Sequence, residues 1–242
     1  MRHIALAAIL VGGAALAGCR TDWATASRES AGIAPLPSEV EESIVQVYAA
    51  RAFSWRGVFS VHSWFAVKRS SAAAYEVIDV TGWRVRRGEG RAVAIREDIP
   101  DRQWFGAEPT LLQELRGEAA TAAIPKLIEA AEEYPYSMSY RMFPGPNSNT
   151  FVSYVLRQVP ELTVELPPHA VGKDWLEGGG PVDWTESGTG AQLNLLGLLG
   201  LQLGAAEGVE LNVLGFNFGV DLWAPALKLP FIGRLGFPDR PF

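Results

Sequence analysis

The sequence contains one cysteine, three histidines and no excess of basic residues, and each shortage excludes a class of protein. Because Cys19 is the single cysteine, an intramolecular disulfide cannot form. The histidines at positions 3, 62 and 169 lack the spacing of a metal-ligand set, so we expect no metal and no other cofactor. With 21 Lys and Arg against 27 Asp and Glu, the chain lacks the surplus of cations that binds phosphates. We therefore expect no nucleic acid among its partners.

The N-terminal segment has the pattern of a secretory signal. Arg2 precedes an uncharged apolar run over residues 4–17, which is too short to span a bilayer of about 30 Å at about 1.5 Å per residue. The run ends in "LAGC", residues 16–19, which resembles a bacterial lipobox, where the peptidase cleaves before the cysteine and the thiol receives diacylglycerol. An ordinary signal peptide with an incidental cysteine is the alternative. We predict a signal peptide over residues 1–18 and lipidation of Cys19.

The residues after the cysteine bear on location. Residue 20 is Arg and not Asp. In the Gram-negative lipoproteins that this N-terminus resembles, a residue other than Asp after the lipidated cysteine implies transport to the outer membrane. We therefore expect attachment to the periplasmic face of the outer membrane through Cys19. The segment that follows contains Ser, Ala, Gly and Pro without apolar periodicity, so we predict a flexible tether over residues 19–37.

Residues 38–185 have the pattern of an α+β domain whose mostly antiparallel sheet packs on helices. Strands are predicted over four segments rich in Val, Ile and aromatic residues, with the second and third joined as a hairpin at "RSSA": "SIVQVYAAR", "GVFSVHSWFAVKR", "AAAYEVIDVTGW" and "GRAVAIRED". Apolar residues three and four apart predict helices over "EPTLLQELR" and "GEAATAAIPKLIEAAEEY", with Pro125 at the start of a second segment. "SMSYRMF" predicts a short strand, and residues 148–159 predict a helix that ends at Pro160.

Residues 186–242 are rich in Gly and Leu. The uncharged stretch between Glu186 and Glu207 is long enough to cross a bilayer as a helix. However, the polar residues between positions 192 and 221 mostly share one parity in alternating runs, and the many glycines disfavour a helix. We therefore predict an extension of β-hairpins with one apolar face.

Two short motifs carry the candidate site. "VHSWFAVK" supplies His62 at the start of a strand, and "NSNTF", residues 147–151, supplies Ser148 at the start of a helix. This order resembles the circularly permuted papain-like fold of permuted NlpC-type peptidases and lecithin retinol acyltransferase-like enzymes, whose nucleophile lies in a motif of the type Asn-Cys-x-x-Phe. The resemblance implies His62 as the base and places Ser148 where those enzymes have the nucleophilic Cys. The chain looks still more similar to a family of bacterial lipoproteins of unknown function with "HSWFAVK", "GPNSNTF" and "GKDWL"-like segments.

A third site residue would orient His62. If the hairpin turn is centred near Ser70 and Ser71, His62 lies opposite Val80, and strict alternation places Glu76 on the same face. Glu76 is therefore the predicted third catalytic residue, with a solvated strand charge as its alternative.

Two functions remain open from the sequence. The start of a helix can stabilise an alkoxide or an oxyanion, yet Asn147 or Ser148 can equally be an ordinary N-cap. A Ser hydroxyl becomes nucleophilic only with a base in contact, so the missing Cys favours a binding or structural envelope module with a degenerate site. Its ligand would be a cell-wall peptide or a lipid. The alternative is a Ser/His-dependent hydrolase or acyltransferase that acts on a cell-wall peptide amide or a lipid ester.

Overall fold

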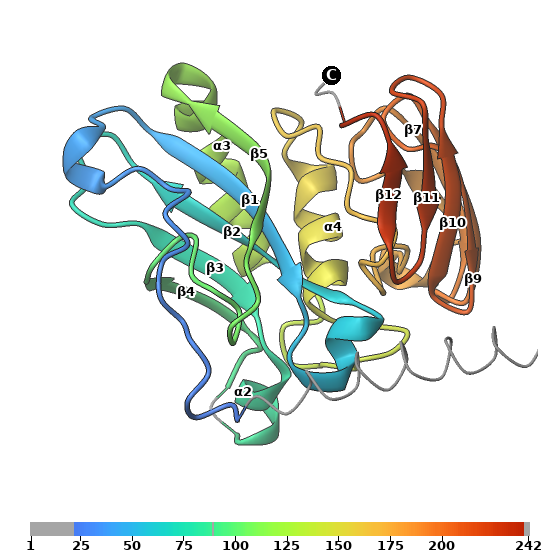
Figure 1. Cartoon of the computed structure of the whole chain (residues 1–242), viewed down its shortest axis with the longest axis horizontal. Coiled ribbons are helices and arrows are strands. Elements are labelled where there is room, and N and C mark those ends of the chain that lie inside the picture. The colour runs from blue at the N-terminus through green and yellow to red at the C-terminus, as the bar shows by residue number, and fades with distance from the viewer. Residues whose placement is uncertain (1–21, 89, 240–242) are drawn as a thin grey trace, which may run out of the picture.

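Two antiparallel sheets lie on either side of one helix, α4 (Ser148–Gln158), which gives a mixed α+β fold (Figure 1). The computed structural model describes residues 22–88 and 90–239. The predicted signal peptide and Cys19 lie outside the described residues. Among the helices of the described part, none has the length and apolar character needed to cross a membrane.

The first sheet has five strands in the order β4-β3-β2-β1-β5, and every neighbouring pair is antiparallel. Its strands are β1 (Ile44–Arg51), β2 (Val61–Lys68), β3 (Glu76–Val80), β4 (Val93–Glu97) and β5 (Thr110–Arg116). Helix α3 (Gly117–Glu132) and α4 cover one face of this sheet. The remaining helical elements are α2 (Gly82–Arg86) and the 3-10 turns η1 (Pro37–Glu39), η2 (Ser54–Val58) and η3 (Glu177–Gly179). The predictions of β1 to β4 and of α4 are confirmed.

Strand β2 divides its residues between the two faces of the sheet, as alternation requires. Val61 and Phe65 belong to the large apolar core against α3 and α4. Trp64 belongs to a smaller apolar cluster on the opposite face, where its ring stacks on Tyr48 at 5.5 Å between centroids. The two clusters make β2 a fully buried central strand.

Three predictions of local structure on this half are wrong. Residues 110–116 form the edge strand β5 and not a helix, because the apolar spacing of so short a segment fits both structures and pairing with β1 decides between them. Pro125 lies inside the continuous helix α3, where the buried stripe around Leu127 outweighs the one hydrogen bond that a proline removes. Residues 137–143 form turns and bends in place of a strand.

The described part of the predicted tether, residues 22–37, is bound to the domain and is not a free linker. The buried carboxylate of Asp101 accepts hydrogen bonds from Ser30 Oγ at 2.8 Å and from the backbone N–H of Ile33 at 2.6 Å. Arg28 lies over the ring of Phe105, 4.4 Å from its centroid. Composition suggested a linker, but a carboxylate that lies far along the chain holds the segment in place.

The second sheet is a meander of seven strands in sequential order, so the predicted β-hairpins are confirmed. Its strands are β6 (Val182–Trp184), β7 (Gly190–Leu195), β8 (Leu199–Gly204), β9 (Gly208–Val213), β10 (Phe216–Asp221), β11 (Ala226–Leu229) and β12 (Gly233–Gly236). Because β6 pairs with β7, this sheet begins before residue 186, where we place the start of the extension. The motifs "LNLLG", "LNVLG" and "LPFIG" begin at residues 193, 211 and 229, an even spacing that marks successive hairpins and that our sequence reading missed.

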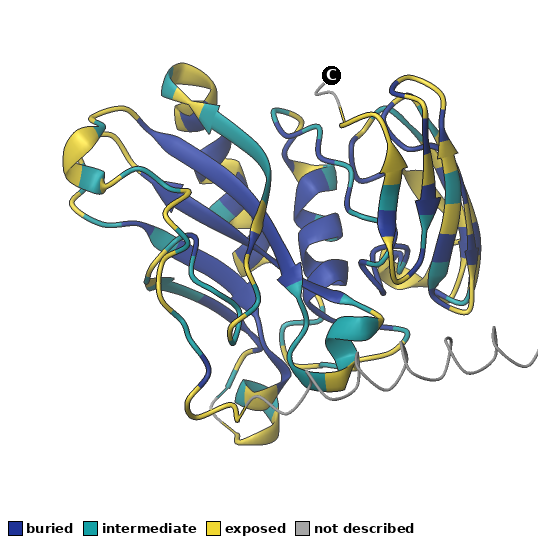
Figure 2. Ribbon diagram, in the orientation of Figure 1, coloured by how far each residue is buried: buried dark blue, intermediate teal, exposed yellow. Residues whose placement is uncertain are grey.

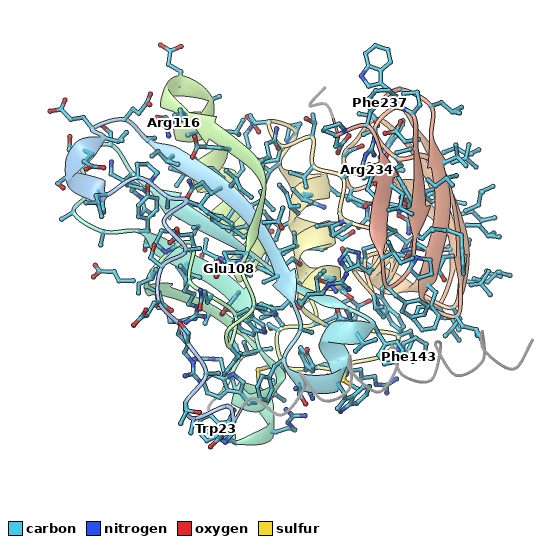
Figure 3. The ribbon with its side chains drawn as sticks, in the orientation of Figure 1. Trp23, Glu108, Arg116, Phe143, Arg234 and Phe237 are labelled. Carbon is cyan, nitrogen blue, oxygen red and sulfur yellow. The ribbon has the colours of Figure 1, made fainter. Side chains whose placement is uncertain are left out.

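The seven-stranded sheet buries its polar side and exposes its apolar side (Figures 2 and 3). Its polar face, turned toward α4, consists of buried side chains: Gln192, Asn194, Gln202, Glu210, Asn212, Asn217, Asp221 and Lys228. Its apolar face consists of side chains that are between 37 % and 66 % exposed: Val182, Trp184, Leu193, Leu195, Leu199, Leu201, Leu203, Val209, Leu211, Val213, Phe218, Val220, Leu227 and Leu235. This arrangement is the reverse of an ordinary half-buried sheet.

Candidate functional site

The start of α4 is capped by Asn147, and Ser148 occupies the first helical position. The Asn147 side-chain oxygen accepts hydrogen bonds from the backbone N–H groups of Asn149 at 2.9 Å and Thr150 at 3.2 Å. Thr150 Oγ1 in turn accepts from the Asn147 N–H at 3.1 Å, which completes a reciprocal capping arrangement. The sequence left open whether Asn147 or Ser148 is the N-cap. The structure shows that Asn147 is the N-cap and that Ser148 is buried.

The other polar groups of this turn bind the backbone of residues 171–173. The Nδ2 groups of Asn147 and Asn149 both donate to the Val171 carbonyl, each at 2.9 Å. Thr150 Oγ1 donates to the Gly172 carbonyl at 2.8 Å. A side chain at Gly172 would collide with Asn147, since an added Cβ would lie 2.4 Å from Nδ2. The conspicuous polar motif thus fastens a loop to a helix.

Asn149 also ties α4 to β2. Its Oδ1 accepts from Ser63 Oγ at 2.9 Å, and its Nδ2 donates to the Val61 carbonyl at 3.1 Å. Ser63 and Asn149 are both buried, so each bond replaces water that these groups would otherwise need. The residue of β2 that faces the start of α4 is therefore Ser63 and not His62.

His62 lies on the opposite face of the sheet from α4. Its ring stacks on Trp104 with 3.6 Å between centroids and an interplanar angle of 12°. Burial lowers the pKa of His62 to about 3, although the nearby negative charge of Asp79 opposes this shift. A buried neutral imidazole behind the sheet does not contact Ser148, so the structure does not bring the predicted base and nucleophile together.

Glu76, the predicted third residue, lies on the helix-covered face, away from His62. The hairpin pairs Phe65 with Ile78, one residue out of the predicted register, and this shift exchanges the two faces of β3. Glu76 is paired with Arg69 at the partly exposed end of the strand. Asp79, on the same strand, lies on the His62 face.

Asp79 is the centre of a charged cluster that sequence reasoning missed. Arg96 donates to its two oxygens at 2.7 and 3.1 Å, and Arg102 donates at 3.2 Å. Burial alone would raise the pKa of Asp79, but the hydrogen bonds and the charge of Arg96 hold this pKa below its usual value. A cavity of about 50 Å³ beside Asp79 and Trp104 has room for water and not for a substrate. Alternation in "VAIRE" could have placed Arg96 on this face.

A second charged cluster joins the two halves of the molecule between α4 and the polar face. Lys173 Nζ lies 3.2 Å from Glu186 and 2.7 Å from Glu210, and it donates to the Leu166 carbonyl at 3.0 Å. Burial opposes the charged amine, but Glu186 and Glu210 raise the pKa of Lys173 well above its usual value. Lys228 extends the cluster, 3.3 Å from Glu210.

Asp174 anchors the same loop to the polar face through amides. Its Oδ2 accepts from Asn212 Nδ2 at 2.6 Å and from Asn217 Nδ2 at 2.9 Å, and its carbonyl accepts from Gln192 at 2.8 Å. Burial raises the pKa of Asp174 to about 6. The "GKD" segment, which entered our sequence reading only through a resemblance, therefore supplies the contacts that hold the second sheet.

One group of carboxylates has the spacing of a cation site. Oxygen atoms of Glu165, Asp221 and Asp239 lie within 4.8 Å of one another. Lys228 lies 2.5 Å from Glu165, and Arg234 lies 2.5 Å from Asp221 and 3.8 Å from Asp239, so each of the three carboxylates already has a protein cation as partner. This arrangement serves ion pairing better than metal binding.

The chain belongs to a family of unknown function. The family model described as "Protein of unknown function (DUF3750)" matches residues 42–175, which is more than half of the chain. The match includes the five-stranded sheet, both helices that cover it and the loop that α4 binds, and it ends before the seven-stranded sheet. No curated protein and no solved structure matches the chain.

Proposed function

We propose that this protein is a non-catalytic module of the bacterial envelope, attached by lipid on Cys19 to the periplasmic face of the outer membrane. The observation that carries the non-catalytic part is the separation of His62 from Ser148 by the thickness of the five-stranded sheet. In addition, Asn147, Asn149 and Thr150 at the helix start are engaged in hydrogen bonds to the adjacent loop and strand. A binding or structural role, with a cell-wall peptide or a lipid as ligand, fits this geometry better than acyl transfer.

We further propose that the family domain is a degenerate form of the permuted papain-like fold. The order of its elements supports this proposal, because a sheet precedes a helix whose first turn carries the Asn-Ser-x-x-Phe motif and packs on β2. In this chain Ser63 takes the position that faces the motif, and it makes a structural bond to Asn149. Ser148 thus holds the position that the nucleophile has in those enzymes, but no base lies beside it in the manner of the enzymes.

Cellular fractionation tests the proposal directly. With Cys19→Ala, the protein is expected to leave the membrane pellet and to accumulate as a soluble or unprocessed form, because the acylated cysteine carries the chains that hold it at about 0.8 kcal/mol per buried CH₂. Ser148→Ala is the matched control and should stay in the pellet. A serine-directed fluorophosphonate probe should label the wild type no more than Ser148→Ala. Retention of Cys19→Ala in the pellet would refute the anchor, and labelling that depends on Ser148 would refute the non-catalytic role.

A further inference from the structure

The apolar face of the seven-stranded sheet is not covered by any other layer of the described chain. A sheet is stable in water when its apolar side is covered, and here all seven strands contribute apolar side chains to the uncovered side. Figure 2 shows exposed and buried residues alternating along these strands, and Figure 3 shows side chains of this sheet projecting away from the rest of the molecule. Contiguous apolar patches of this extent are rare on monomers and mark interaction sites.

The inverted orientation of the sheet is fixed by its buried side. Lys173, Glu186 and Glu210 are at most 1 % exposed and satisfy one another's charge only when the polar face is turned inward. Turning the sheet over would bury leucines against these charges and expose the ion pairs. The exposed apolar face is therefore a specified feature of the fold.

We infer that this apolar face packs against the same face of a second copy of the chain, forming a two-layer β-sandwich dimer. Two sheets pack face to face about 10 Å apart when their inner faces are apolar, which is the chemistry this face offers. Because the patch is apolar throughout, it can pack against an identical patch. This property suits a two-fold interface, where the same surface serves both copies.

The size of the face is sufficient for a stable dimer. Seven strands at about 4.8 Å spacing, with three to six residues each at about 3.3 Å per residue, cover roughly 550 Å² per copy in plan. Two copies would bury about 1,100 Å² or more, which exceeds the roughly 1,000 Å² that a specific interface needs. The described side chains of the apolar face are uncharged and do not repel one another when two copies approach, although the chain has a net charge of −6.

The position of the chain start favours a second copy over the anchoring bilayer, and this step rests on the proposed anchor. Cys19 precedes Asp22 by three residues, which span at most about 11 Å when extended. Figure 3 shows Trp23 at the bottom of the molecule, at the end away from the seven-stranded sheet. The described start of the chain thus lies on another side of the molecule than the apolar face, which argues against the anchoring bilayer as the cover of that face. A two-fold axis along the membrane normal leaves both anchors on the same side.

Sedimentation equilibrium of the processed chain, residues 19–242 with Cys19→Ala, tests the dimer without the lipid. The expected mass is that of two copies. Leu211→Glu, in the middle of the central strand β9, should remain folded because its side chain is exposed, and should weaken dimerisation at least about tenfold, which corresponds to 1.4 kcal/mol. Ala119→Glu, on the exposed surface of α3, is the control and should remain dimeric.

Disulfide formation gives a second readout in the same background, where an introduced cysteine is the single thiol. Leu211→Cys should form a disulfide-linked dimer on mild oxidation, and Glu118→Cys on α3 should not. If the chain with Cys19→Ala alone is monomeric, the inference is overturned, whether or not phosphatidylcholine vesicles then bind the face. Equal masses for wild type and Leu211→Glu overturn it as well, because the contact would lie elsewhere. Since Cys19 is absent from these chains, failure here leaves the proposed anchor standing.

Discussion

Replacing Lys173 with methionine is expected to lower the free energy of unfolding by about 3–5 kcal/mol at pH 7. The amine is fully buried between Glu186 and Glu210, and its removal leaves these two buried carboxylates without the cation that they share. The loss is a large fraction of the 5–15 kcal/mol that typically stabilises a domain. Urea unfolding followed by circular dichroism measures it.

Lys126→Met is the matched control for this prediction. Lys126 pairs with one glutamate, Glu161 at 2.5 Å, and its side chain is 46 % exposed. Water screens that pair, so its loss should cost less than about 1 kcal/mol. If both variants lose the same small amount of stability, Lys173 is hydrated in solution and the buried cluster does not hold the two sheets together.

The wild type should lose stability in acid through His62. Its pKa is about 3 in the folded state and near 6.5 in the unfolded chain, so the unfolded state binds the proton first as the pH falls. The contribution of neutral His62 is complete above pH 6.5, and it declines below that value until the folded state also protonates near pH 3. At pH 5 the loss amounts to about 2 kcal/mol.

His62→Phe isolates this effect. The phenyl ring keeps the stacking on Trp104 and does not titrate, so the variant should lose about 2 kcal/mol less than the wild type between pH 7.5 and pH 5. Other titrating groups, such as Asp174 with its raised pKa, act equally in both proteins and cancel in the difference. Parallel stability curves for the two proteins would mean that His62 is accessible to water and protons in the native state.

The sequence predicts local structure well where local chemistry decides it. The Val- and Ile-rich runs predict β1 to β4, and Asn147 followed by an apolar stripe and Pro160 predicts α4. Strand β5 could not be predicted from the sequence, because its seven residues fit both the helical and the strand period. The strand with which it pairs, β1, lies more than 60 residues earlier. Glu76 was assigned to the wrong face since one residue of register reverses every side chain of a strand.

The orientation of the second sheet shows a different limit. Alternation in "GVELNV" reveals two faces, one polar and one apolar, and the usual rule buries the apolar one. The reverse holds here because Lys173 and Asp174 present charges to Glu210 and Asn212 from a distant loop. A pattern of single residues does not contain that pairing, so the buried cluster required the structure.

A cysteine at position 148 tests our proposal that the Asn-Ser-x-x-Phe motif is a structural tie and not an active site. In a chain with Cys19→Ala, the pKa of the Ser148→Cys thiol is measured from the pH dependence of its reaction with iodoacetamide, with His62 present and with His62→Phe. Because His62 faces the other side of the sheet, the thiol should have the same pKa in both proteins. A thiol pKa that rises by about one unit or more when His62 is replaced would place the imidazole beside position 148 and contradict the account.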